Sequence, residues 1–261
     1  MIRRIAPALA VLLLAGCVGS NFNLATQREE RTITSTDKEV EAGRKLARSV
    51  EREMTVAPDE PLQSRVRAIG ARLVAVCDRR DLVYSFTVLE DKDINAFSLP
   101  GGYVFVNDGL VKAAKNDDEL AGVLAHEVAH VAARHAVKRF EGRLGAQLLQ
   151  LATLAAGQGA AARGAGVALQ AASLAYARQD ELEADRLAVK YLKAAGFNPE
   201  GMLTFLRTLE ASQRSRTHYL PRGVVRPYYA QTHPFVPERA LAVKEALYGV
   251  ADYIDYLNSP R

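Results

Sequence analysis

Apolar and polar residues follow helical spacing over long stretches of this chain and strict alternation over one short stretch. Residues 82–89 alternate and are rich in β-branched and aromatic side chains, which predicts a strand. Two shorter strands are expected at 94–98 and 103–106, joined by a Pro-Gly-Gly turn. Helical spacing, interrupted at Ala57-Pro58, predicts helices at 37–54, 60–77, 116–140 and 174–195. The pattern therefore favours an α+β domain, mostly helical, with a small three-stranded sheet that is antiparallel or mixed.

Residues 142–175 are rich in alanine and glycine and lie between two of these expected helices. Gln150, Gln158 and Arg163 interrupt each apolar run before it reaches 18 residues, so we do not expect a transmembrane hairpin. One more helix is expected at 144–156, followed by a loop at 157–166. The loop either covers a neighbouring cleft as a lid or simply packs on the domain.

The first residues have the features of a targeting segment. Two arginines precede a short apolar run, and the L-A-G-C sequence that ends at Cys17 resembles a bacterial lipobox. The alternative is an ordinary secretory peptide with an unmodified cysteine. Val18 resembles the pattern of lipoproteins anchored in the outer membrane and facing the periplasm. We therefore expect lipidation of Cys17 and three segments: a signal peptide at 1–16, a lipidated tether at 17–36 and one domain at 37–261.

Composition agrees with a single domain that needs no disulfide. The 261 residues are 49% hydrophobic but only 7% aromatic, so we expect a core of Leu, Val and Ala. If Cys17 is lipidated, Cys77 has no partner in the chain and is interpreted as a small buried hydrophobe. Without the two leader arginines, 32 basic and 30 acidic residues leave a net charge of +2. No basic block indicates nucleic-acid binding.

One expected helix carries the motif H-E-x-x-H at residues 126–130. Asn116, with Glu119 three residues later, predicts where that helix begins. Residues four apart share a helix face, so His126 and His130 can bind one metal ion. Glu127 then lies close enough to take a proton from a water at that metal. The alternative is a chance match, which is rare in a chain with five histidines.

Further carboxylates follow in the sequence E-L-E-A-D at residues 181–185. Glu181 and Asp185 are four apart and share a helix face, whereas Glu183 points elsewhere. One of the two can bind the metal, and the other can accept the second N–H of a ligand imidazole. The alternative is a solvated charged face, which is what most such runs are.

These motifs resemble the M48 family of zinc metallopeptidases. Three further segments match the family's motifs in the family's order: N-A-F…P-G-G at 95–102, A-R-x-x-E at 177–181 with Ala where Ser is usual, and T-H-P…E-R at 232–239. The resemblance covers about residues 38–248. It implies a zincin-like metallopeptidase domain with one Zn²⁺ per chain. The implied roles are metal ligation by His126, His130 and Glu181, general base catalysis by Glu127, and support of a ligand imidazole by Asp185.

The resemblance also places His233 near the metal. There it would either donate a hydrogen bond to the oxyanion or complete the zinc coordination at rest; a capping or core histidine is the alternative. Arg239 is a second candidate for the oxyanion. His135 lies off the ligand face and is interpreted as structural, and His218 is expected to be exposed.

The short strand around Asn95, Ala96 and Phe97 is expected at the edge of the sheet. An exposed edge strand can bind an extended peptide as an additional strand. The alternative is an ordinary buried hairpin.

The sequence therefore favours a zinc-dependent endopeptidase that is anchored by lipid in a bacterial cell envelope. Resemblance suggests unfolded or misassembled envelope proteins as its substrates. One alternative is an assembly factor that binds other proteins and uses zinc only structurally, but that role does not need Glu127. Another is a peptidoglycan amidase, which does not fit the H-E-x-x-H and E-x-x-x-D motifs.

Overall fold

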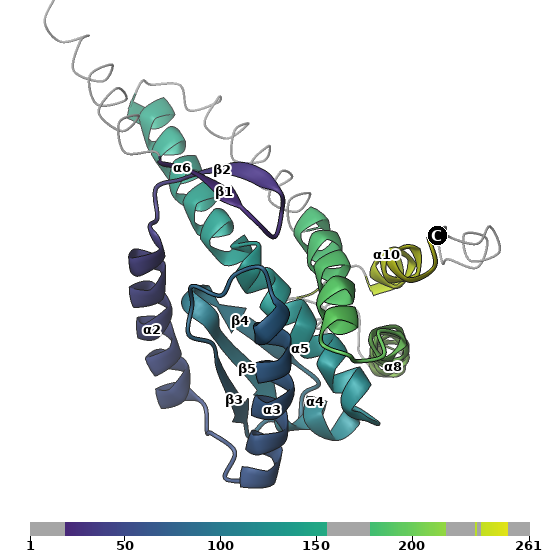
Figure 1. Ribbon diagram of the computed structural model, residues 1–261. Helices are drawn as coiled ribbons and strands as arrows, with labels where there is room; N and C mark the ends of the chain where they lie inside the picture. The colour runs from purple at the N-terminus through teal and green to yellow at the C-terminus, as the bar shows by residue number, and fades with distance from the viewer. Residues whose placement is uncertain (1–18, 156–177, 218–232, 234–235, 250–261) are drawn as a thin grey trace, which may run out of the picture.

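The computed structural model describes residues 19–155, 178–217, 233 and 236–249, which form helices packed around a small sheet (Figure 1). Within these ranges no helix is both long and apolar enough to cross a membrane. The expected signal peptide and Cys17 lie outside the described residues, as do the loop at 157–166 and His218.

The central sheet is mixed and has the strand order β3-β5-β4. β3 runs parallel to β5, with Phe86 opposite Val104, and β4 runs antiparallel to it, with Phe97 opposite Phe105. The expectation of a three-stranded sheet is thus confirmed, and the mixed alternative is the correct one. The strands are β3 (Ser85–Leu89), β4 (Ala96–Leu99) and β5 (Tyr103–Asn107), and the turn η2 (Pro100–Gly102) joins the last two.

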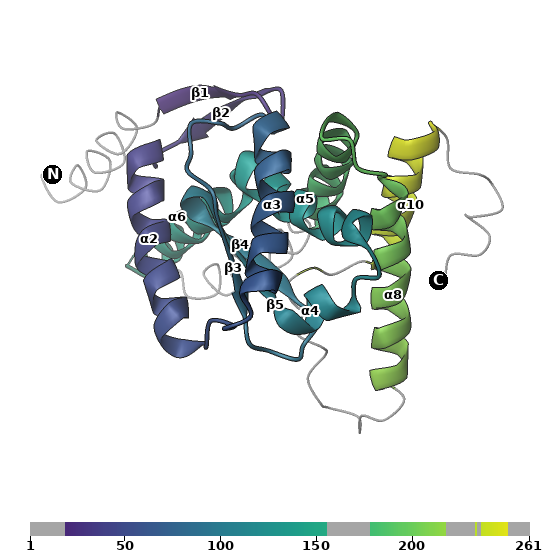
Figure 2. The same cartoon turned by 60° about the horizontal axis from the view of Figure 1, so that its bottom comes forward.

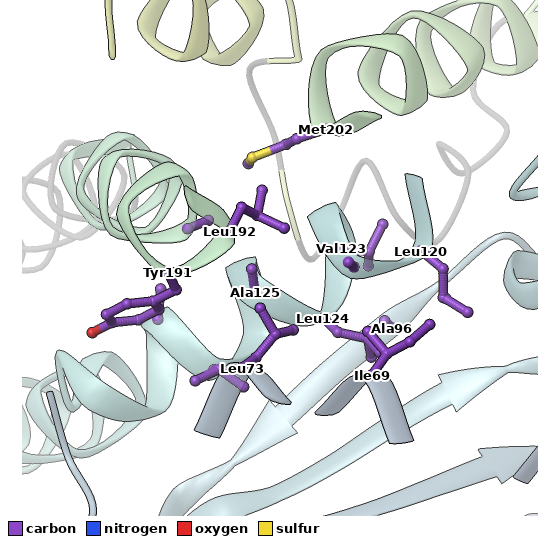
Figure 3. Close-up of a cluster of buried hydrophobic side chains, with 14 of the residues drawn as sticks. Ile69, Leu73, Ala96, Leu120, Val123, Leu124, Ala125, Tyr191, Leu192 and Met202 are labelled. Carbon is purple, nitrogen blue, oxygen red and sulfur yellow. The ribbon is translucent and has the colours of Figure 1, made fainter. Parts of the chain in front are cut away.

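Helices cover both faces of this sheet (Figure 2). Helix α2 (Thr36–Glu53) packs on one face through Ala47, against Phe105 and its stacked neighbour Phe97. The opposite face packs against α3 and α5, and Figure 3 shows Ile69, Leu120 and Leu124 of these helices near Ala96. These two helices are α3 (Glu60–Val76) and α5 (Asp117–Ala132). The sheet thus holds α5 in the interior of the molecule.

Helix α5 begins where the sequence predicts. The Asn116 side chain accepts a hydrogen bond from the backbone N–H of Glu119 at 2.9 Å, and three acidic residues occupy the first turn. Its other neighbours include a helix at 178–194 and α8, and α10 packs on α8 (Figures 1 and 2). The remaining labelled helices are α4 (Asp108–Ala113), α8 (Glu200–Thr217) and α10 (Val236–Tyr248).

The sequence predicts one helix over 116–140, but the structure divides it in two. Arg134 has a φ of 57°, a left-handed conformation that ends α5 and lets α6 (His135–Ala155) start in a new direction. The Arg134 guanidinium donates to Glu39 Oε2 at 3.0 Å and to the Thr34 carbonyl at 2.6 Å. These contacts with residues about 100 positions earlier hold the break, and no local signal marks it.

The segment at 17–36, predicted to be an irregular tether, contains a hairpin of β1 (Gly19–Asn23) and β2 (Arg28–Thr32). Its polar side chains bind the α5–α6 region: Asn23 Nδ2 donates to the Ala132 carbonyl at 3.3 Å, and Thr32 Oγ1 donates to Glu141 at 2.7 Å. No periodic apolar pattern marks these strands in the sequence, because polar contacts with distant helices hold them in place.

Candidate metal centre

Three separate stretches of the chain bring polar side chains together in the core. Helix α5 supplies His126, Glu127 and His130, and the helix at 178–194 supplies Glu181. His233 joins them from the segment before α10. All five are buried, with at most 7% of any of them exposed. So many ionisable groups away from water need either mutual pairing or a bound ion.

Four of these residues offer donor atoms that all lie within 4.8 Å of one another: His126, His130, Glu181 and His233. The Nε2 atoms of His126 and His130 are 2.9 Å apart, and each lies 3.3 Å from the Glu181 carboxylate. His233 Nδ1 lies 3.3 Å from His126 Nε2 and 3.1 Å from Glu181 Oε2. Tetrahedral zinc with bonds of 2.0–2.1 Å separates its ligand nitrogens by about 3.3 Å. The spacing and chemistry of these four donors fit a metal ion.

Glu127 lies beside this group without belonging to it. Both of its carboxylate oxygens are buried and accept no hydrogen bond from any described residue. His233 Nε2 lies 3.4 Å from Glu127 Oε1. A buried carboxylate without donors is costly unless a substrate, water or ion completes its surroundings.

Asp185 and Arg239 support His126 from its other nitrogen. Asp185 Oδ1 is 2.8 Å from His126 Nδ1, and Arg239 binds both oxygens of Asp185 at 2.9 Å each. Arg239 is only 1% exposed, so this bidentate pair is fully buried. Although burial favours the neutral acid, Arg239 and then His126 hold the pKa of Asp185 below its ordinary value of 3.8. Arg239, considered above as an oxyanion donor, is thereby engaged with Asp185.

Without a metal, the pKa values of the two histidines of α5 are shifted in opposite directions. Burial and the Arg239 charge oppose protonation of His126, but Asp185 and Glu181 outweigh them and raise its pKa to about 9. Burial holds the pKa of His130 well below 6.5. Although burial also opposes the charge of Glu181, His233 and then His130 hold its pKa well below 4.5. A metal ion at this cluster therefore replaces a proton on His126 and faces an ionised Glu181.

His135 is the buried group at this centre that sequence reasoning missed. Its Nδ1 lies 2.7 Å from His130 Nδ1, and its Nε2 lies 3.2 Å from Glu183 Oε2. A continuous helix would place His135 about 140° round the axis from His130. Only the break at Arg134 brings the two rings together, so no sequence pattern could have identified the contact.

The edge strand predicted around Asn95 is present as β4. It pairs with β5 on one side only, and α5 lies against it. Asn95 and Ala96 are buried, and the Phe97 ring stacks on Phe105 with 5.3 Å between centroids. What this strand offers to a ligand is therefore its backbone rather than these side chains.

The chain belongs to peptidase family M48, whose model matches residues 60–247. This range contains the three-stranded sheet and the whole buried cluster. The resemblance drawn from the motifs is confirmed at the level of the family.

Several characterised relatives are similar to this chain. It is 31% identical to the beta-barrel assembly-enhancing protease of Escherichia coli K12 over 219 residues, which are 80% of this chain and 43% of that protein. It is 29% identical to the mitochondrial metalloendopeptidase OMA1 of Schizosaccharomyces pombe, covering 72% of this chain and 53% of that one. It is 27% identical to the metalloprotease YcaL of Escherichia coli K12, covering 62% of each. The chain thus spans less than half of the first of these relatives.

Proposed function

We propose that this chain is a zinc-dependent endopeptidase of the bacterial cell envelope, with zinc held by His126, His130 and Glu181. The observation that carries the proposal is the buried group of four converging donors beside Glu127, whose oxygens accept no hydrogen bond from the described residues. A zinc ion used only for structure would need no such carboxylate. The names of the relatives, all proteases, agree with this choice.

The chemistry divides between the metal and Glu127. Bound zinc supplies a Lewis acid that polarises the scissile carbonyl and makes water more acidic. Glu127 takes the proton of the attacking water and delivers it to the leaving amine. Neither oxygen accepts a hydrogen bond from the described residues, so both can accept that proton.

The test is hydrolysis of unfolded casein by the purified, zinc-loaded protein. Glu127→Gln should keep the metal and the fold but lose about 10²–10⁴-fold in rate, because an amide cannot accept the proton. Glu245→Gln makes the same chemical change at an exposed position of α10 and should cleave like wild type. Glu181→Ala should lose zinc in elemental analysis. Activity in Glu127→Gln within a few-fold of wild type would remove Glu127 from the mechanism.

His233 is proposed to be the resting fourth ligand. Its Nδ1 lies among the other donor atoms, at 3.1 Å from Glu181 Oε2 and 3.3 Å from His126 Nε2, so substrate must displace it. His233→Ala should then retain zinc on three ligands and raise the basal rate of peptide cleavage. A lower rate with zinc retained would instead assign His233 to the oxyanion.

The edge of β4 is the proposed site for the substrate backbone. The Asn95 carbonyl accepts from Asn107 N–H of β5 at 2.9 Å, so residues 95, 97 and 99 direct their backbone groups to β5. Ala96 and Ser98 then direct theirs outward. Ser98→Pro removes one outward N–H and should raise the KM for peptides while zinc content stays unchanged. An unchanged KM would exclude strand addition at this edge.

The proposed substrates are unfolded or misassembled envelope proteins, and the proposed location is the outer membrane, facing the periplasm, with the lipid anchor at Cys17. The lipobox sequence and the relative named for β-barrel assembly support this proposal. Fractionation and mass spectrometry of the native protein should find an acylated Cys17, and Cys17→Ser should release it from membranes. Proteins retained by Glu127→Gln in cells identify the substrates, and retention of cytosolic proteins alone would contradict the proposal.

A further inference from the structure

His135 meets His130 through the nitrogen that does not face the metal site. The two Nδ1 atoms are 2.7 Å apart, and the rings meet edge to face with centroids 4.8 Å apart and an angle of 74°. Two ring nitrogens at this distance form a hydrogen bond only if one carries the hydrogen and the other a lone pair. The direction of that bond depends on what His130 does with its other nitrogen.

A metal at the cluster fixes this direction. His130 Nε2 lies among the converging donors and must offer its lone pair to the ion, so the hydrogen of His130 is on Nδ1. His135 Nδ1 is therefore the acceptor, and its own hydrogen is on Nε2. That nitrogen faces Glu183 Oε2 at 3.2 Å and Asp180 Oδ1 at 3.7 Å, which are both acceptors.

We propose that His135 is a positioning residue of the metal centre. In its neutral form it accepts a hydrogen bond from His130 Nδ1–H, and its own Nε2–H donates to Glu183. This inference rests on the proposed zinc site. It makes the supports of the two ligand histidines different. His126 is held by the buried carboxylate of Asp185, whereas His130 is held by a neutral ring.

The neutral ring has an electrostatic consequence. Glu127, Glu181 and Asp185 already place three carboxylates at the centre, all almost fully buried. A fourth carboxylate in contact with His130 would add buried negative charge and weaken the Lewis acidity of the metal. With His135 in between, the nearest charge on that side is Glu183, which is 22% exposed and faces Arg28 at 3.8 Å. His135 thus fixes the His130 ring without bringing a charge into contact with it.

The first test is the zinc affinity of the whole protein, measured by competition with a chelator. His135→Leu should weaken zinc binding about 10–100-fold, the usual loss for a group that supports a ligand. His135→Asn places an amide oxygen near the position of Nδ1 and should recover most of that loss, whereas a purely packing role would favour Leu. Arg28→Ala removes the exposed neighbour of Glu183 and should bind zinc like wild type.

The second test needs no variant and so does not depend on folding of the mutants. Long-range ¹H–¹⁵N spectra of the zinc-loaded wild type should show His130 with its hydrogen on Nδ1 and His135 with its hydrogen on Nε2. A His135 hydrogen on Nδ1, or zinc affinity in His135→Leu equal to wild type, would overturn the inference and leave the zinc site standing. A wild type that binds no zinc would overturn both.

Discussion

Asp185 has no exposed surface, and its charge is compensated entirely by neighbours within the protein. Its oxygens face His126 Nδ1 and the Arg239 guanidinium, and each of these partners is itself buried. A buried ionised carboxylate is tolerated only with such complete pairing. Asp185 therefore acts on the metal indirectly, by fixing the orientation of the His126 ring.

Asp185→Asn should weaken zinc binding about 10–100-fold. The amide keeps one acceptor but must present an NH₂ group either to Arg239 or to the His126 Nδ1–H, both of which are donors. Chelator competition measures the effect. Asp78→Asn is the matched control, because Asp78 pairs with Lys190 and Tyr191 outside the centre. Equal zinc affinity in wild type and Asp185→Asn would show that Asp185 does not fix the ligand ring.

At the scale of elements, α5 and α8 cross with their backbones in contact. A Cβ at Gly122 would lie 2.7 Å from Met202 Cα, and a Cβ at Gly201 would lie 2.4 Å from the Asp118 carbonyl carbon. Each helix thus contributes one glycine where the other helix's backbone passes. This close crossing sets the position of α5 in the interior, and with it the position of residues 126–130.

Gly122→Ala should destabilise the protein by about 1–3 kcal/mol, because overpacking against backbone outweighs the gain of about 1 kcal/mol in helix propensity. Urea unfolding measures this change. Gly142→Ala is the control: it lies in α6 with nothing within 4 Å of the added Cβ and should be neutral or stabilising. A Gly122→Ala variant as stable as wild type would mean that α8 can shift without cost.

Three weakly acidic side chains, Cys77, Tyr84 and Tyr191, are grouped near the end of α3, and Tyr191 joins the helix at 178–194 to Asp78. Tyr191 donates to Asp78 at 2.8 Å, and the thiol of Cys77 lies 3.8 Å from the Tyr84 hydroxyl. Burial is the largest cause that raises the pKa of Cys77 above 9.0 and those of Tyr84 and Tyr191 above 10.0. Because these folded pKa values are raised, the neutral forms stabilise the fold.

This stabilisation is fully present below about pH 9 and is lost as pH rises through the folded pKa values. We expect the free energy of unfolding to fall between pH 9 and pH 11, by up to about 1.4 kcal/mol per pH unit for each group. Urea unfolding at pH 8, 9.5 and 11 measures it. Tyr84→Phe should flatten the decline, and a stability independent of pH in wild type would contradict the argument.

At the scale of the whole molecule, the metal site joins three separate parts of the chain. These are α5, the helix at 178–194 and His233, which precedes α10. A metal that binds the folded state alone stabilises it by about 4 kcal/mol at a thousandfold excess over its Kd. Removal of the metal breaks the connection between these three stretches. The buried histidine and glutamate side chains are then left to pair with one another.

Chelation should therefore lower the melting temperature by roughly 10 °C, at about 2–4 °C per kcal/mol for a chain of this size, and added zinc should restore it. Calorimetry with and without chelator measures the shift. His126→Ala, which removes a proposed ligand, should melt at the same temperature in both conditions. A wild type whose melting is unaffected by chelator would argue against a metal at this cluster.

The sequence by itself determined the features that depend on local spacing. Four-residue spacing placed His126 with His130, and Glu181 with Asp185, on shared helix faces. Asn116 set the start of α5, and alternation over 82–89 located β3 to within about three residues. These features follow from backbone geometry over a few residues, so a single amino-acid sequence is enough to predict them.

Only the tertiary structure decided which distant groups meet. The break at Arg134 depends on Glu39 and Thr34, and without that break His135 would not reach His130. The β1–β2 hairpin likewise depends on polar contacts with α5 and α6. The stabilising partners in each case lie about 100 positions away, and their energy becomes available only when the whole chain has folded. Local periodicity does not depend on such contacts, so they cannot be predicted from the sequence pattern alone.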